Sequence, residues 1–253
     1  MKKKKKKDFR PRLNGQRKAM YEKWTNKENR VLVIGDTHCP FDLDTYLDFL
    51  VDTYNNYNCN RVVHIGDEID NCAASYHESN ADGYGAGHEL EVAIERLQRY
   101  YKVFPNVDVI IGNHSRMVMR KAQTGGVPKK WIKEYNQVLE VPKWTFQTEL
   151  VIDDVLYIHG EAGTARTKAK ADLQSVVQGH LHTQLYSEYF VGRNRRIFGL
   201  QVGCGIDHQA YAFNYAKAGK KPAIGCGVVI GGKQAIAVPM ELEKYGNISK
   251  ILI

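Results

Sequence analysis

Residues 31–40 read VLVIGDTHCP, an apolar run that ends at a glycine and is followed by two polar residues, Asp36 and His38. A continuous apolar run of this length predicts a buried parallel strand. Ligands of open α/β sheets bind outside the carboxyl ends of the strands. Because side chains alternate along an extended chain, we expect Asp36 and His38 on the same side, within reach of one ion. For this segment alone, a turn aspartate beside an incidental histidine is the alternative.

Two further apolar runs end in the same way, RVVHIGD at 61–67 and VDVIIGNH at 107–114. The segments before them have apolar residues at helical spacing, which predicts helices over 43–57 and 88–104. The order β-α-β-α-β indicates an α/β fold with polar residues at the carboxyl end of each strand.

The second half of the chain contains hairpin patterns. Residues 148–160 predict two strands joined at Asp153-Asp154, and two later pairs of strands are expected to turn at Gly192–Asn194 and at Gly231-Gly232. These hairpins predict a second, more antiparallel sheet beside the first.

Two segments lie outside this pattern of strands and helices. A basic, partly helical insert is expected at about 115–145, and residues 72–87, which contain three glycines, are expected to form a mobile loop on the side of the site.

Positive charge is concentrated at the N-terminus. Residues 1–30 contain thirteen Lys or Arg and three Asp or Glu, a charge of +10, so the net +8 leaves −2 for the rest of the chain. The run Lys2–Lys7 is expected to repel itself and stay disordered, and residues 15–24 could form a short helix. We predict a basic arm over 1–30 and one domain over 31–253. The arm is either a tether for nucleic acid or a solvated tail.

The composition narrows the class of protein. Hydrophobic residues make up 43% of 253 residues, enough for one sizeable core. No apolar stretch approaches the ~20 residues that span a bilayer, and the N-terminal charges are not followed by the apolar segment of a signal peptide. Five cysteines without a CxxC pair argue against disulfides or a thiolate zinc site. We expect a soluble, cytoplasmic protein with no membrane partner.

Polar residues follow five apolar runs, and a glycine adjoins nearly every one of them. One such placement could be a satisfied polar group in the core, but five together predict a binding site at the strand ends. The residues are Asp36, His38, Asp67, Asn113, His114, His159, His180 and His182.

In chain order, the segments GDTH, GDEID, GNH, HG and GHLH resemble the motifs of the calcineurin-like metallophosphoesterases. The resemblance extends over about residues 31–205. It implies an α/β (α+β) fold in which two mixed β-sheets pack as a sandwich flanked by helices. It also implies a pair of metal ions that hydrolyses phosphate esters with a hydroxide held between the ions.

The resemblance gives seven residues a ligand role. Asp67 would bridge the two ions. The other ligands would divide into Asp36, His38 and His182 for one ion and Asn113, His159 and His180 for the other. The neutral Asn113 keeps the summed ligand charge low, so that the ions remain electrophilic. Imidazole and oxygen ligands together favour two divalent transition-metal ions, with manganese as the first choice and iron, zinc, cobalt or nickel as alternatives.

His114 is placed next to a predicted ligand, where it could protonate the leaving alkoxide as a general acid. In the protein phosphatase branch of the family, the aspartate three residues after the bridging one orients this histidine. Asp70 stands at that position, and a helix N-cap is its alternative role.

Two places depart from the family pattern. Ser115 stands where many members have Asp or Glu, so a different network is expected around the ligands. Asn71 and Cys72 replace the arginine and glycine of the protein phosphatases, which weighs against that activity. Arg116 or Arg120 could bind the substrate phosphate instead, because a guanidinium matches phosphate oxygens. A solvated helix charge is the alternative for each.

Residues 116–133 place six basic residues around Trp131. Basic charge interleaved with an aromatic residue is typical of a platform for single-stranded nucleic acid or a nucleotide, although a lysine-rich helix that caps the fold has the same pattern. Three further histidines, His77, His88 and His208, are candidates for lining the cleft, and a surface or core position is the alternative for each.

These patterns predict a dinuclear metal-dependent phosphoesterase. A phosphodiesterase acting on nucleic acid or nucleotides is favoured, because the arm and the insert are basic and the arginine of the protein phosphatases is missing. A phosphomonoesterase for proteins or small molecules is the alternative. A non-catalytic nucleic-acid-binding protein on the same fold is a third reading, against which the intact ligand set argues.

Overall fold

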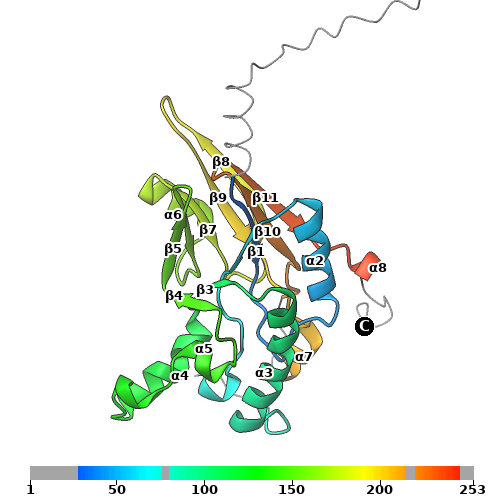
Figure 1. Ribbon diagram of the computed structural model, residues 1–253, viewed down its shortest axis with the longest axis vertical. Coiled ribbons are helices and arrows are strands. Elements are labelled where there is room, and N and C mark those ends of the chain that lie inside the picture. Colours follow the sequence, from blue (N-terminus) through cyan, green and yellow to red (C-terminus); the bar gives the residue numbers. More distant parts are fainter. Residues whose placement is uncertain (1–27, 76–79, 215–219, 246–253) are drawn as a thin grey trace, which may run out of the picture.

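The computed structural model describes residues 28–75, 80–214 and 220–245, which form two β-sheets with helices around them (Figure 1). The first sheet has six strands, in the order β11 (Gln234–Pro239), β10 (Gly225–Ile230), β1 (Arg30–Ile34), β2 (Arg61–His64), β3 (Asp108–Ile110) and β4 (Thr145–Gln147). The second sheet has five, in the order β5 (Glu149–Ile152), β6 (Val155–Ile158), β7 (Ser175–Gln178), β9 (Arg196–Val202) and β8 (Leu185–Val191).

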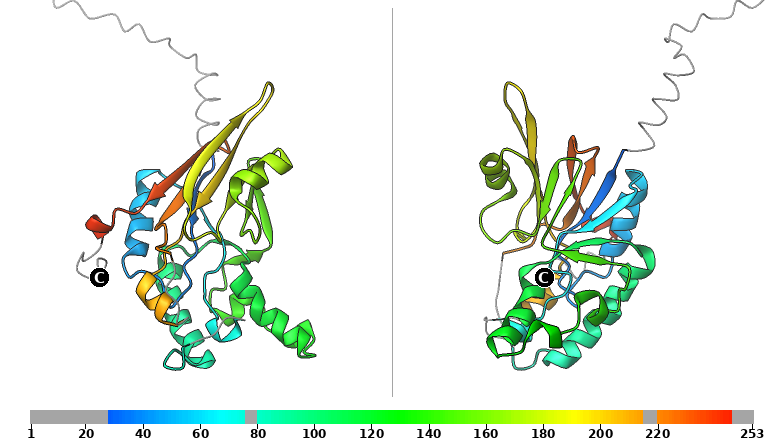
Figure 2. Two further views of the ribbon diagram at one scale, coloured as in Figure 1. Left: turned by 180° about the vertical axis from the view of Figure 1, so that it is seen from behind. Right: turned by 60° about the vertical axis from the view of Figure 1, so that its left-hand side comes forward.

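Seven α-helices and two short 3-10 helices are found in the described part of the chain. They are α2 (Tyr46–Asn56), η1 (Cys72–Ala74), α3 (Ala86–Val103), α4 (Asn113–Thr124), η2 (Lys129–Trp131), α5 (Tyr135–Val138), α6 (Ala165–Asp172), α7 (His208–Asn214) and α8 (Leu242–Tyr245). Helices α2 and α6 lie on opposite outer sides of the pair of sheets (Figure 2).

Alternation along β1 divides the core in two. Val31 and Val33 point into the sandwich, where they belong to one apolar cluster with residues of the second sheet such as Leu200. Leu32 and Ile34 point to the other face, into the cluster that contains residues of α2 and α3. All four side chains are buried. The first strand is therefore covered on both faces, which explains its continuous apolar sequence.

Both sheets are mixed, and the predicted sandwich of two mixed sheets is confirmed. In the first sheet, β1, β2, β3 and β4 are parallel neighbours. In the second, β7 pairs in parallel with β6 and β9, while the outer strands β5 and β8 are antiparallel to their neighbours. The carboxyl ends of the parallel strands carry the predicted site.

One expectation about the sheets is wrong. The hairpin that turns at Gly231-Gly232 does not belong to the second sheet, because β10 pairs antiparallel with β1 and extends the first sheet instead. The hairpin of β8 and β9 does lie in the second sheet. Turn residues identify a hairpin, but its outer partner is a long-range contact that local sequence does not encode.

Several other expectations concern the chain as a whole. The run Lys2–Lys7, the short helix at 15–24 and His77 lie outside the described residues. All five cysteines are buried free thiols. In the described segments, no helix is long and apolar enough to cross a bilayer.

Candidate metal centre

The first group of predicted ligands joins the loop after β1 to the loop after β7. The Asp36 carboxylate is 3.1 Å from Nε2 of His182, and it accepts a hydrogen bond from the backbone N–H of His180 (2.9 Å). Nε2 of His38 lies 3.1 Å from Nε2 of His182. Asp36 and His38 are fully buried, so solvent does not reach an ion between them from the interior of the protein.

The second group joins the loops after β2, β3, β6 and β7. Nε2 of His159 is 3.1 Å from the Asp67 carboxylate and 2.9 Å from Oδ1 of Asn113. Nδ1 of His180 is also 2.9 Å from that amide oxygen. The Asp67 carboxylate lies 3.7 Å from Nε2 of His38 as well. Asp67 therefore stands between the two groups, the place expected of a shared ligand.

Backbone geometry brings these side chains together. His38, Asp67 and His180 have φ values of 47°, 50° and 65°, in the left-handed region that non-glycine residues adopt rarely and at a cost of about 1–3 kcal/mol each. Strand alternation is not what aligns Asp36 with His38, because β1 ends at Ile34. The two side chains converge through this turn, which corrects the reason given by the sequence pattern.

Asp70 contacts both histidines nearest to it. Its Oδ1 is 2.6 Å from Nδ1 of His38 and 3.3 Å from Nδ1 of His114, and its backbone carbonyl is 2.5 Å from the same nitrogen of His114. With Nδ1 of His114 held in this way, Nε2 is left for a substrate. The carboxylate lies closer to His38 than to His114. The N-cap residue of η1 is Asn71, which follows Asp70.

The positions that depart from the family pattern have clear partners. The amide of Asn71 donates to the backbone carbonyl of His114 (3.2 Å). The hydroxyl of Ser115 donates to the buried carboxyl of Glu68 (2.8 Å). An acidic group therefore lies beside residue 115, but it comes from the loop after β2. Sequence inspection missed Glu68, which is distinguished only by its place after Asp67.

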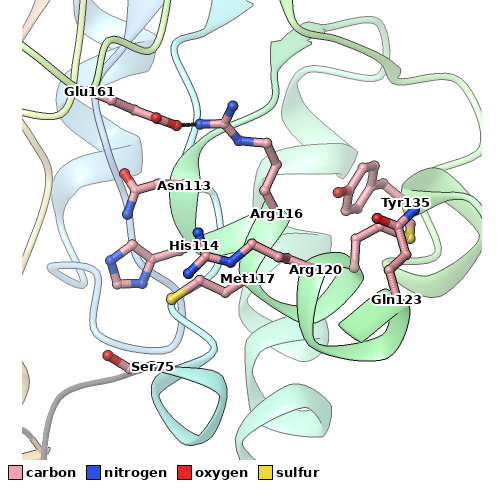
Figure 3. Close-up of a pocket in the computed structure, with 10 residues that line it drawn as sticks. Ser75, Asn113, His114, Arg116, Met117, Arg120, Gln123, Tyr135 and Glu161 are labelled. Carbon is pink, nitrogen blue, oxygen red and sulfur yellow. Dashed lines mark ion pairs between the residues drawn. The ribbon is translucent and has the colours of Figure 1, made fainter. Parts of the chain in front are cut away.

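A pocket of about 570 Å³ opens beside the metal centre along α4 (Figure 3). Arg116 and Arg120, the two residues predicted to bind the substrate phosphate, both line it. The guanidinium of Arg116 forms an ion pair with Glu161, whereas that of Arg120 points toward His114. Glu161 has no sequence signal beyond lying two residues after His159.

Two further histidine candidates lie within the described residues. His88 is in the first turn of α3, where its side chain is 64% exposed and lies near Glu91. His208 is the first residue of α7. Neither belongs to the metal-binding groups found among the described residues. The same short helix contributes an unpredicted neighbour, Tyr211, whose ring centroid is 5.2 Å from that of His38.

Comparison with known families identifies the chain. The family model named calcineurin-like phosphoesterase matches residues 29–198, two thirds of the sequence, from the start of β1 into β9. The chain belongs to this family. A calcineurin-like phosphoesterase is a hydrolase that acts on phosphoric esters with a pair of divalent metal ions, which is the class of enzyme predicted from the motifs.

Solved structures with a similar fold are distant in sequence. Vacuolar Protein Sorting 29 from Cryptosporidium parvum is 14% identical with a TM-score of 0.40, over 83% of this chain and 86% of that one. The phosphoesterase Yfce from E. coli has the same identity and TM-score, over 83% and 99%. Nuclease MPE from Pseudomonas putida is 14% identical with a TM-score of 0.37, over 83% and 87%. No curated protein sequence matches this phosphoesterase.

The donor atoms of this phosphoesterase fit a metal pair. His38 donates Nδ1–H to Asp70 and His159 donates Nδ1–H to the carbonyl of Ile65, so Nε2 of each ring can face an ion. Oδ2 of Asp36 lies 3.1 Å from Nε2 of His182, so this carboxylate oxygen faces the other ligands of its group.

Electrostatics of the metal-free centre also favour a cation. Burial opposes charge on His159, but the Asp67 carboxylate outweighs burial and raises the pKa of His159 to about 9. Burial likewise opposes the ionised Asp67, but the neighbouring His159 holds its pKa well below the usual range. Binding of a metal ion at Nε2 of His159 should therefore release a proton.

Acid should destabilise the metal-free phosphoesterase through the buried His64. Burial lowers the pKa of His64 to about 4, whereas the unfolded chain takes up the proton near pH 6.5. Stability is thus lost as the pH falls below 6.5. We therefore compare urea unfolding in EDTA at pH 7.5 and pH 5.5. Between these two pH values, the free energy of unfolding of His64→Gln should fall by about 1 kcal/mol less than that of the wild type. Glutamine can keep the contact with Thr37.

Substitution of the exposed His88 by glutamine provides the control, since it should leave the pH dependence as in the wild type. An equal loss of stability in the wild type and in His64→Gln would show that His64 is protonated in the folded chain.

Proposed function

We propose that this phosphoesterase is a phosphodiesterase that acts on nucleic acid or nucleotides. The observation that carries the proposal is the position of α4. The helix begins with the predicted ligand Asn113 and the predicted acid His114, and it continues with Arg116, Arg120 and Lys121. The basic insert is thus attached directly to the metal centre, and a phosphate held at the centre lies at the start of a basic helix.

The predicted residues divide the chemical work. Two bound divalent ions would supply the nucleophile and neutralise the phosphate. His114, held through Nδ1 by Asp70, would donate the proton of Nε2 to the leaving oxygen. Arg120 would bind the phosphate, because its guanidinium points toward His114. Arg116 would contribute less, because Glu161 neutralises it.

The charge of the pocket supports a diester over a monoester. A phosphomonoester carries close to two negative charges at neutral pH and a diester carries one. The pocket lining contains two arginines and the carboxylate of Glu161, so it offers less positive charge than two arginines would. A singly charged phosphate matches this lining better.

The far part of the insert supports nucleic acid. The side chain of Trp131 is 83% exposed, and Lys129, Lys130 and Lys133 around it are exposed as well. An exposed aromatic ring among cations can stack with an unpaired base while the cations meet phosphates. The basic arm over 1–30 would add non-specific affinity. We also propose manganese as the native metal and the cytoplasm as the location, where buried free thiols stay reduced.

A substrate panel tests this proposal. Manganese-loaded protein is expected to hydrolyse bis(4-nitrophenyl) phosphate and single-stranded RNA or DNA with a higher kcat/KM than 4-nitrophenyl phosphate. Labelled duplex DNA serves as the comparison for strand preference. A kcat/KM for the monoester that exceeds that for every diester would overturn the phosphodiesterase in favour of a phosphomonoesterase.

A further inference from the structure

We infer that the pocket along α4 binds the nucleoside that leaves during hydrolysis, with its base at the far end. This assignment rests on the proposed function, because it names how the diester would lie in the site. The pocket lining joins the metal centre, through Asn113 and His114, to three side chains farther along, which are Met119, Gln123 and Tyr135.

The length of the pocket exceeds that of a phosphate group. Five lining residues follow the spacing of one helix face, namely Asn113, Arg116, Met117, Arg120 and Gln123. From His114 to Gln123, the helix advances about 13 Å at a rise of 1.5 Å per residue. The volume of about 570 Å³ lies in the range of sites that enclose a small organic ligand. A phosphate bound at the centre would leave most of this space empty.

The far end of the pocket has the groups that hold a flat, polar-edged ring. The ring of Tyr135 is fixed from behind by stacking on Phe146, with centroids 5.5 Å apart. Its hydroxyl lies 3.4 Å from the carbonyl of Ser115. Met119 lines the pocket and offers a polarisable sulfur for contact with an aromatic ring. The amide of Gln123 can both donate and accept hydrogen bonds (Figure 3). A nucleobase uses all of these contacts, and an alkyl alcohol would use few.

The position of His114 decides which half of the diester enters the pocket. His114 lies at the inner end of the pocket, and a general acid must contact the leaving oxygen. Water that has lost a proton to solvent forms the new P–O bond while the P–O bond to the nucleoside breaks. The departing alkoxide takes the proton from Nε2 of His114. The products are a phosphomonoester and a nucleoside with a free hydroxyl, and the nucleoside side of the diester lies along α4.

Filling the far end of the pocket tests this orientation. We expect Gln123→Trp in manganese-loaded protein to lower kcat/KM for a dinucleotide. This loss should be at least about tenfold larger than the loss of kcat/KM that the same variant shows for methyl 4-nitrophenyl phosphate. The size corresponds to the loss of one base contact. Adenosine and uridine should compete with methyl 4-nitrophenyl phosphate in the wild type, with inhibition constants raised about tenfold in the variant. Val118→Trp is the matched control, because Val118 is exposed on the same helix and is absent from the pocket lining.

The outcomes separate the pocket from the proposed function. If the wild type cleaves the dinucleotide and Gln123→Trp cleaves it equally well, the pocket does not bind the nucleoside and the phosphodiesterase stands. If no diester is cleaved, the proposed function fails, and equilibrium dialysis of adenosine and uridine against the wild type and both variants still decides whether the pocket binds a nucleoside. Thermal unfolding verifies the fold, and Tyr135→Ala provides a second loss of nucleoside affinity at the other wall.

Discussion

Replacement of Asp67 by asparagine is expected to lower kcat for every phosphoester by at least about 10³-fold and to remove one or both metal ions. Asp67 is buried and lies between the two histidine groups, so no other carboxylate of the described residues can serve both ions. A metal ion stabilises the charge of the transition state by several kcal/mol, and loss of that stabilisation corresponds to a decrease in kcat of about 10³-fold. Metal content by mass spectrometry and turnover of bis(4-nitrophenyl) phosphate provide the two measurements.

Thermal unfolding distinguishes loss of the centre from loss of the fold. Metal should raise the melting temperature of the wild type, because a ligand that binds only the folded chain stabilises it. Asp67→Asn should lack this increase, and in EDTA it should still unfold cooperatively but at a lower temperature than the wild type, since the buried His159 loses its paired carboxylate. The matched control is Asp52→Asn, which alters a surface ion pair with Lys244. Full metal content and turnover within tenfold of the wild type would exclude Asp67 as the bridging ligand.

Substitution of His114 by asparagine is expected to lower kcat about 10²-fold or more for diesters with an alkoxide leaving group, and much less for 4-nitrophenyl esters. A general acid matters most when the leaving group is a strong base, because such a group cannot depart unprotonated. Metal content should stay the same, since Nδ1 of His114 is held by the carbonyl of Asp70 and the ring is not required as a ligand. Rates for a series of diesters with leaving groups of different basicity measure the effect.

Asp70→Asn should give a different pattern. Its carboxylate contacts both His38 and His114, so this variant should weaken metal binding about 10- to 100-fold as well as slow the alkoxide esters. His88→Asn, at an exposed position, serves as the control for both variants. Loss of metal from His114→Asn would reassign His114 as a ligand, an arrangement its distance from His38 and Asp67 allows.

The sequence predicted those parts of the site that depend on local pattern. An apolar run followed by glycine and a polar residue marks the carboxyl end of a buried strand, and parallel strands bring such ends to one edge. For this reason Asp36, Asp67 and Asn113, which follow the parallel strands β1, β2 and β3, could be grouped although they are far apart in the chain. Their metal-binding roles come from the family motifs and are what the Asp67 variant tests.

Other parts of the site depend on contacts that have no local signal. Glu161 meets Arg116, and Tyr211 lies against His38, because loops and a short helix are positioned by the whole fold. Asp70 is shared between two rings for the same reason. The position of β10 beside β1 also escaped prediction, since an apolar strand is equally suited to either sheet.

That position of β10 has a consequence for synthesis. Arg30 pairs with Ile230, and the backbone carbonyl of Asp36 accepts a hydrogen bond from Gly205. At a translation rate of about 5–20 residues per second, roughly ten to forty seconds separate the emergence of β1 from that of its antiparallel partner. During this interval one edge of an apolar strand stays unpaired, which is the kind of surface that aggregates or is held by chaperones. The nascent chain therefore cannot complete the first sheet until β10 has left the ribosome, whereas the hydrogen bond to the Asp36 carbonyl requires only that Gly205 has emerged.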